Sequence, residues 1–118
     1  MLPPNVGPPK HLIFTHADQE KGLHDQFVYQ GYVSREDRAR HQMINGNRLV
    51  IKFRDEVIGE GQINLIEATN LEKLSAYDAI LSGLGNVDVL RKHLLETVLR
   101  GEKKPAQAEF FRVLFRWL

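Results

Sequence analysis

The chain has 118 residues, 42% of them hydrophobic and 26% charged, a composition typical of one soluble globular domain with its own core. Its net charge of +1 gives no argument for a broad nucleic-acid footprint, so any such role needs a local patch. The absence of cysteine excludes disulfides, thiol nucleophiles and zinc–thiolate sites, and no apolar run has the length of a membrane span. Prolines stand where a signal peptide has its apolar core, so we expect a cytoplasmic protein.

The first half of the chain is expected to begin with an arm, a strand and a helix. Residues 1–9 carry four prolines and a glycine and are predicted to form a flexible arm, ahead of a single domain over residues 10–118. The apolar run 11–15 is typical of a buried strand. Residues 18–29 carry apolar side chains four positions apart and predict a short amphipathic helix.

The densely charged segment 31–38 starts with a glycine and is predicted to be a strand. Alternate side chains of a strand point to the same face, so Glu36 and Arg38 would project together. They can form a structural ion pair, or they can recognise a ligand. In the second case, Arg38 would bind a phosphate or a base edge and Glu36 would accept from an exocyclic amine.

The second half shows clearer local signals. Residues 45–47 have turn chemistry, and the segments 48–53 and 57–68 alternate as the two strands of a hairpin. Gly59 and Gly61 predict a bulge or sharp bend in the return strand.

Two helices and a final strand complete the predicted chain. Ser75 and Asp78 have the spacing of a capping box, and Asn86 can cap a second helix that Gly101 closes. Residues 109–118 alternate as an aromatic-rich strand. This order of elements predicts an α+β fold, a small mixed and mostly antiparallel β-barrel with two or three flanking helices.

Three segments in this order carry a resemblance to a known family. Residues 28–38 resemble a glycine-x-lysine-x-x-glutamate-x-arginine signature, with Gly31, Glu36 and Arg38 at the matching positions. Residues 45–50 resemble a glycine-aspartate turn into a central strand, although Asn47 replaces the aspartate. The C-terminal half is matched by the segments 74–78, 85–91 and 111–118. Together they resemble the ASCH domain family, part of the PUA-like β-barrel superfamily.

The resemblance implies a polar cleft that binds RNA or a nucleotide-like small molecule. The residues expected to line this cleft are Gly31, Tyr32, Glu36 and Arg38. The residues expected to contact phosphates around it are Arg35, Arg40 and Arg48. Because the net charge is close to zero, we expect few phosphate contacts and a shallow salt dependence. The leading hypothesis is a binding module without catalysis, in a monomer or weak homodimer.

Val33 occupies the position of the signature lysine. The resemblance implies that this lysine is catalytic in the family's enzymes. Valine carries no charge and transfers no proton, so we assign no catalytic residue and lean against an enzyme. The alternative is a hydrolase of RNA or of an acylated cytidine, with Glu36 as general base. Another side chain would then replace the lysine, and the candidates are Tyr32, Lys10 and Lys52. A third alternative is a protein-interaction domain with an inert cleft.

We expect no cofactor and no metal. Neither His16 nor His24, each near one aspartate, has a third ligand at a recognisable spacing. The serines lack a nucleophile-elbow motif, and there is no glycine-rich phosphate loop. Arg112 and Arg116 share one face of the last predicted strand and form a second candidate basic strip.

Overall fold

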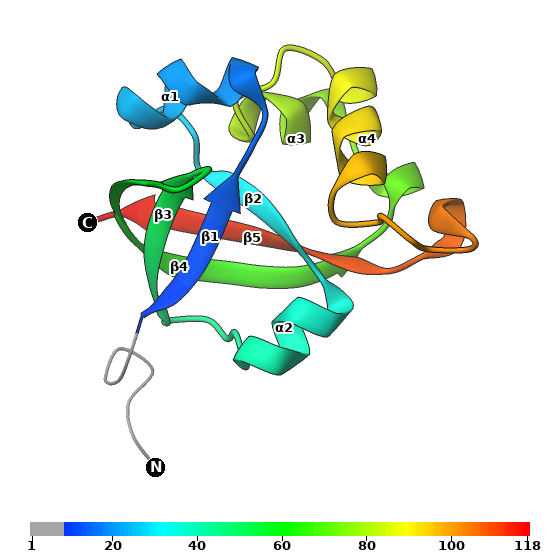
Figure 1. Cartoon of the computed structure of the whole chain (residues 1–118), viewed down its shortest axis with the longest axis horizontal. Helices are drawn as coiled ribbons and strands as arrows, with labels where there is room; N and C mark the ends of the chain where they lie inside the picture. The colour runs from blue at the N-terminus through cyan, green and yellow to red at the C-terminus, as the bar shows by residue number, and fades with distance from the viewer. Residues whose placement is uncertain (1–8) are drawn as a thin grey trace.

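One five-stranded mixed sheet forms the centre of the protein in the computed structural model, which describes residues 9–118 (Figure 1). The strands lie in the order β1-β3-β4-β5-β2, with β1 parallel to β3 and the other neighbours antiparallel. Their bounds are β1 (Lys10–Phe14), β2 (Gln30–Ser34), β3 (Arg48–Phe53), β4 (Glu56–Thr69) and β5 (Phe110–Trp117). Apart from Pro9, the predicted arm of residues 1–9 lies outside the described residues.

The sheet curls into a half-barrel, and its longest strand, β4, is irregular at two places. Its pairing with β3 shifts at Ile51, opposite Gly59, and its pairing with β5 shifts between Ile63 and Leu65. Extra residues of this kind bend a strand and increase its twist. The first irregularity confirms the bend predicted from the glycines of the return strand. The curl brings the two edge strands, β1 and β2, against each other.

Gly31 on β2 permits this close approach of the edge strands. A Cβ atom at that position would lie 3.0 Å from Leu12 Cδ2 and 3.0 Å from Phe14 Cζ, both on β1. These separations are shorter than ordinary van der Waals contacts between carbon atoms. The seam between β1 and β2 therefore depends on a residue without a side chain.

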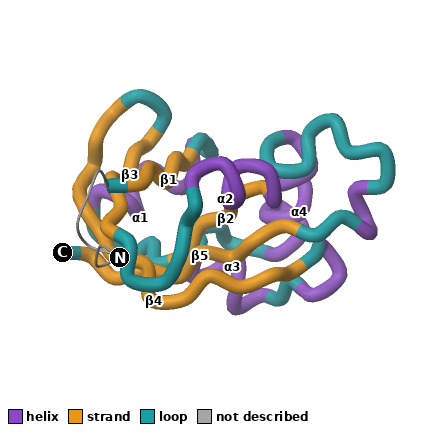
Figure 2. Tube along the Cα trace, turned by 90° about the horizontal axis from the view of Figure 1, so that it is seen from below, coloured by secondary structure: helices purple, strands orange, loops and turns teal. Residues whose placement is uncertain are grey.

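Short helices are attached around the half-barrel. Figure 2 shows β4 and β5 running side by side through the length of the molecule, with α2, α3 and α4 around them. The α-helices are α1 (Glu20–His24), α2 (Arg35–His41), α3 (Ala76–Leu81) and α4 (Val87–Glu96). Single 3₁₀ turns occupy Ala17–Gln19, Leu71–Lys73 and Pro105–Gln107. Within residues 9–118, no helix is both long and apolar enough to cross a membrane.

The apolar core has two parts, one on each face of the sheet. The inner cluster fills the concave side of the half-barrel and includes Leu12, Ile51 and Phe115. The outer cluster lies under α3 and α4 and includes Leu90 and Phe110. Because successive residues of a strand point to opposite faces, β5 supplies side chains to both clusters. Helix α4, which covers the outer cluster, lies beside the seam between β1 and β2.

The α+β class, the half-barrel with flanking helices, and the hairpin of β3 and β4 are confirmed. The capping box of Ser75 and Asp78 and the cap at Asn86 are present as predicted. The helix predicted over residues 18–29 is wrong in extent, since α1 ends at His24 and Gln26 has a φ of 59°. The segment after Gln26 instead runs beside α3, where the Tyr29 backbone N–H donates to the carbonyl of Leu81 at 2.9 Å.

The strand predicted over residues 31–38 is wrong after Ser34. The Ser34 hydroxyl accepts from the backbone N–H of Asp37 at 3.0 Å and caps α2, so the strand turns into a helix at that residue. In a helix, positions two apart differ by about 200° around the axis. Glu36 and Arg38 therefore do not share a face.

Candidate functional site

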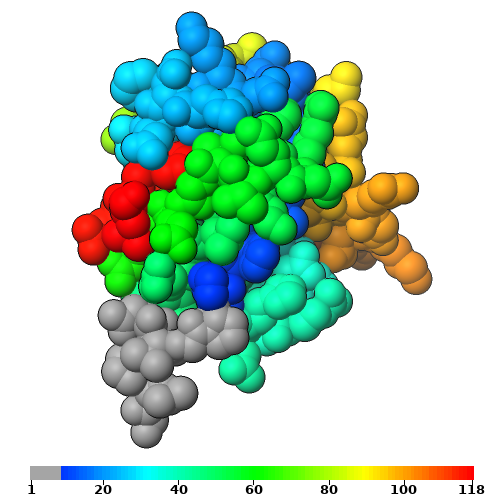
Figure 3. All heavy atoms as spheres, turned by 60° about the vertical axis from the view of Figure 1, so that its left-hand side comes forward, coloured from blue at the N-terminus to red at the C-terminus, as the bar shows by residue number. Residues whose placement is uncertain are grey.

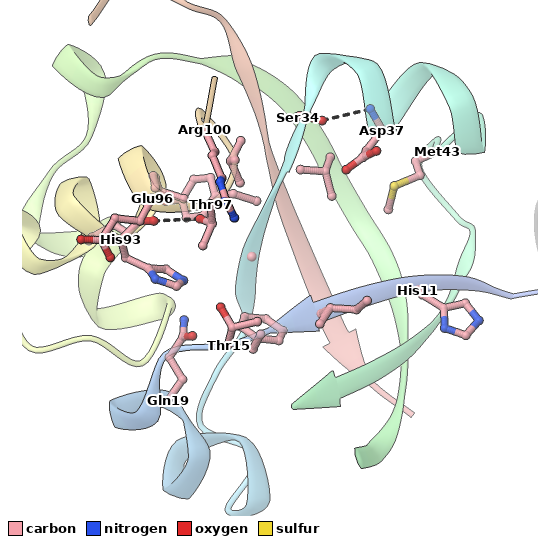
Figure 4. Close-up of a pocket in the computed structure, with 18 of the residues that line it drawn as sticks. His11, Thr15, Gln19, Ser34, Asp37, Met43, His93, Glu96, Thr97 and Arg100 are labelled. Atoms are coloured by element: carbon pink, nitrogen blue, oxygen red, sulfur yellow. Dashed lines mark hydrogen bonds between the residues drawn. The ribbon is translucent and has the colours of Figure 1, made fainter. Parts of the chain in front are cut away.

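A cleft of about 450 Å³ lies along the seam between the edge strands β1 and β2. The two strands form one wall, and α2 and the C-terminal part of α4 with the turn after it form the others (Figure 4). In the space-filling view, part of β1 is visible at the surface between α2 and the β3–β4 hairpin (Figure 3). The cleft is thus built where the half-barrel fails to close.

The lining of the cleft combines apolar side chains with polar and charged ones. Its apolar members come from the strands and from α4, and include Ile13, Phe14, Val33, Leu90 and Leu94. Its titratable members besides Tyr32 are His11, Asp37, His41, His93, Glu96 and Arg100. A surface of this kind offers a packing face and several hydrogen-bonding groups to one small ligand.

Helix α2 places Asp37 and His41 on the cleft side. These residues are four positions apart, so they lie above one another on one face of the helix. Arg40 lies one helical turn after Asp37 and pairs with its carboxylate at 3.4 Å. Both partners are largely exposed, so this pair contributes little stability and Asp37 stays available to a ligand.

Helix α4 and the turn after it supply His93 and Arg100. The His93 ring points toward the 3₁₀ turn that follows β1 and packs edge-on against His16, with ring centroids 5.2 Å apart (Figure 4). Burial lowers the pKa of His93 below its ordinary value, His16 lowers it further, and Glu96 opposes both effects. The lowered pKa favours the neutral form of His93.

Tyr32 connects the cleft to a buried polar network. Gln30 donates to the Tyr32 hydroxyl at 2.6 Å and to Asp78 Oδ1 at 2.9 Å. Asp78 also pairs with Arg112 Nη2 at 2.9 Å, and Arg112 Nη1 binds Glu67. Burial raises the pKa of Tyr32 and the carboxylate of Asp78 raises it further, so the phenol is neutral at physiological pH.

The four predicted cleft residues divide into two pairs. Gly31 and Tyr32 line the cleft, whereas Glu36 and Arg38 are not among its lining residues. Arg38 instead donates from Nε to the Met43 carbonyl at 3.3 Å, and its guanidinium lies 4.6 Å from the centre of the Phe111 ring. These contacts give Arg38 a structural role, and its binding role stays a prediction.

The predicted phosphate contacts also lie outside the cleft lining. Arg35 and Arg40 are exposed on α2, and Arg48 binds both oxygens of the Glu60 carboxylate at 3.0 and 3.1 Å. The arginine that does line the cleft is Arg100. Sequence reasoning missed it because it follows α4, far from the signature segment, and no local pattern distinguishes it from other surface arginines.

The second candidate basic strip, Arg112 and Arg116, does share one face of β5. Arg112 pairs with Glu67 and Asp78. Burial lowers the pKa of Arg112, but Glu67, Asp78 and Tyr32 together raise it, and the net pKa is raised. Arg116 is exposed and binds Gln62 Oε1 at 2.7 Å. Only Arg116 of this pair is therefore open to a ligand from solution.

One group of potential metal ligands lies away from the cleft, where α1 packs beside the β3–β4 hairpin (Figure 3). The side-chain ligand atoms of Glu20, His24 and Glu56 lie within 4.8 Å of one another, and all three residues are exposed. The sequence pattern missed Glu56 as a neighbour of His24 because the hairpin that carries it is distant in the chain. Exposed carboxylates of this kind are ordinary at protein surfaces.

No family model matches the chain, and no curated protein matches it. Among solved structures, the protein EF3133 from Enterococcus faecalis V583, described with the family model DUF984, is similar with a TM-score of 0.72 and 12% identity. That similarity covers 97% of this chain and 78% of the other. A serine-to-alanine mutant of ZmASCH from Zymomonas mobilis has a TM-score of 0.53 and 11% identity, over 98% of this chain and 70% of that one. The chain has an ASCH-like fold.

Proposed function

We propose that the cleft binds a nucleotide-sized ligand, either free or as one unit of an RNA chain, and that it does so without catalysis. The observation that carries the proposal is the cleft itself, whose volume of about 450 Å³ suits one small organic ligand. Its apolar wall, with Ile13 and Val33, can pack against a flat base. Its polar members can hydrogen-bond a sugar and a phosphate, and Arg100 supplies a permanent positive charge.

The signature segment resembles that of the ASCH family, and the chain has an ASCH-like fold. Together these two similarities support an RNA-related ligand. The charge distribution limits how such a ligand would bind. Arg35 and Arg40 are exposed on α2, outside the cleft lining, while Arg100 lines the cleft. A ligand in the cleft would therefore make few phosphate contacts, and its affinity would depend only weakly on salt.

Two side chains support binding in preference to hydrolysis. Val33 lines the cleft and packs against the inner apolar cluster, so the signature position of the lysine is filled by a hydrocarbon. Glu36, the base of the alternative mechanism, is exposed on α2 and is not among the lining residues. A general base must lie within hydrogen-bond reach of the proton it removes.

The test is a fluorescence anisotropy titration with labelled single-stranded RNA, duplex RNA, DNA and a labelled free nucleotide at two salt concentrations. We expect saturable binding that Arg100→Gln weakens by about tenfold, because a hydrogen bond to a charged group contributes about 1.5 kcal/mol. The matched control is Arg116→Gln, which removes an exposed arginine on β5 outside the cleft and should change the affinity by less than about twofold.

The same samples are run on a gel after the titration. Intact RNA with selective loss in Arg100→Gln supports the proposal. Equal loss in both variants would show nonspecific surface binding, and cut RNA would favour the hydrolase. The absence of binding to every oligonucleotide and to free nucleotides would overturn the proposal and leave the protein-interaction domain.

A further inference from the structure

The cleft gathers four of the five histidines of the chain. His11, His41 and His93 line it, and His16 packs against the ring of His93. They come from β1, α2, α4 and the turn after β1, so no local sequence pattern unites them. The fifth histidine, His24, lies on α1 beside Glu56 and outside the cleft lining.

The charge of the cleft depends on the three lining imidazoles. Its other titratable lining groups are Asp37, Glu96, Arg100 and the neutral phenol of Tyr32. Two carboxylates and one guanidinium give the cleft a net charge of −1 when the imidazoles are neutral. With His11, His41 and His93 protonated, the same cleft carries a net charge of +2. Among side chains, imidazole has the ordinary pKa nearest to physiological pH, so a cleft lined by three imidazoles is a candidate for a pH-dependent charge.

We propose that the cleft binds an anionic group of its ligand, a phosphodiester or phosphate, through protonated imidazoles, so that binding takes up protons and tightens as the pH falls. This inference rests on the proposed function and names the part of the ligand that the cleft recognises. A negatively charged phosphate oxygen can accept a charge-assisted hydrogen bond from an imidazolium N–H. This bond is stronger than the one that a neutral imidazole donates.

His93 shows how the binding of an anion is coupled to the protonation of an imidazole. Burial and His16 disfavour the charged form of His93, while Glu96 favours it. An anion placed in the cleft adds a further favourable charge and raises the pKa of the ring. By linkage, a ligand that raises one imidazole pKa by one unit binds about tenfold more tightly below both pKa values than above them. The affinity therefore rises as the pH falls toward the lowered pKa of His93 in the free protein.

Charged groups of both signs lie near the other imidazoles. Lys10 adjoins His11 in the sequence and, like His11 and His41, borders a second hollow beside the cleft. Asp37 lies one helical turn before His41 on α2, and its carboxylate is shared with Arg40. His16 Nδ1 accepts the backbone N–H of Asp18 at 3.1 Å. Asp18 Oδ2 lies 3.8 Å from the same nitrogen and is largely exposed.

The test is isothermal titration calorimetry with the dinucleotide UpU, with uridine and with inorganic sulfate, at about pH 5.5 and about pH 8. UpU carries one negative charge at both pH values, and sulfate carries two. A change of pH therefore alters the charge of the protein and not that of the ligand. We expect UpU to bind about tenfold more tightly at the lower pH and uridine to change by less than about twofold. Repeating UpU at about pH 6.5 in two buffers of different protonation enthalpy should show proton uptake.

The variants His93→Gln and His41→Gln should each reduce the pH dependence of UpU binding. His24→Gln is the matched control and should leave it unchanged, since His24 lies outside the cleft. Circular dichroism at both pH values verifies that each variant is folded.

The possible failures separate the two proposals. Equal affinity for UpU at both pH values, without proton uptake, would overturn the inference and leave the proposed function standing. If sulfate binds at the lower pH and neither uridine nor UpU binds better than sulfate, the inference holds and the nucleotide function falls. No binding of any of the three ligands at either pH would overturn both.

Discussion

The carboxylate of Asp78 connects three elements that are far apart in the sequence. It accepts the backbone N–H of Ser75 at 2.9 Å and so caps α3, it accepts from Gln30 on β2, and it pairs with Arg112 on β5. Only 5% of Asp78 is exposed. Removing it would leave the Arg112 charge partly buried with Glu67 as its remaining carboxylate partner.

We expect Asp78→Ala to lower the free energy of unfolding by about 3 kcal/mol, because it removes one carboxylate of a buried ion-pair network together with the acceptor for Gln30 and Ser75. The control is Asp88→Ala, which removes the partner of Arg91 at a side chain that is 87% exposed and should cost less than about 1 kcal/mol. Urea unfolding of both variants measures the two values. Equal losses would contradict the role given to the network.

Single residues show what sequence reasoning can and cannot reach. The local role of Asp78 in a capping box was predictable, since it depends on a partner three residues away. Its bonds to β2 and β5 were not, because they join residues 48 and 34 positions away. For the same reason the contact of Arg38 with the Phe111 ring was not predicted, and the binding role of Arg38 stays a prediction.

Among the elements, most of those with local signals were predicted, although the end of β2 was missed, and those set by long-range contacts were not predicted. The β3–β4 hairpin and the capped helices follow from turn residues and spacing. The end of β2 also had a local signal, since Ser34 and Asp37 have the spacing of a helix cap. The parallel pairing of β1 with β3 joins residues about forty positions apart, and nothing in either segment specifies it.

The seam between β1 and β2 provides a test at this scale. Gly31→Ala would place a methyl group 3.0 Å from Leu12 and Phe14, so we expect a loss of about 1–3 kcal/mol in the free energy of unfolding. Gly85→Ala is the matched control, because a Cβ there meets no atom within 4 Å and should cause no loss. Thermal unfolding compares them. If the two substitutions act alike, the seam is not tightly packed at Gly31.

At the scale of the whole molecule, the cleft exists because the sheet curls but does not close. Its walls come from β1, β2, α2 and α4, and its imidazoles and Arg100 meet only in the folded chain. The sequence therefore predicted the barrel class and two of the four β2 residues that line the cleft, Gly31 and Tyr32. It could not predict a site assembled from four separate segments.

The most direct test of the cleft as the binding site is a two-dimensional ¹⁵N NMR titration of the protein with UpU near pH 6. We predict that the largest shift changes fall on the backbone amides of Ile13, Val33, Asp37, His93 and Arg100, which surround the cleft. Changes centred on Arg116 and Gln62, or no changes at saturating UpU, would contradict the cleft as the binding site.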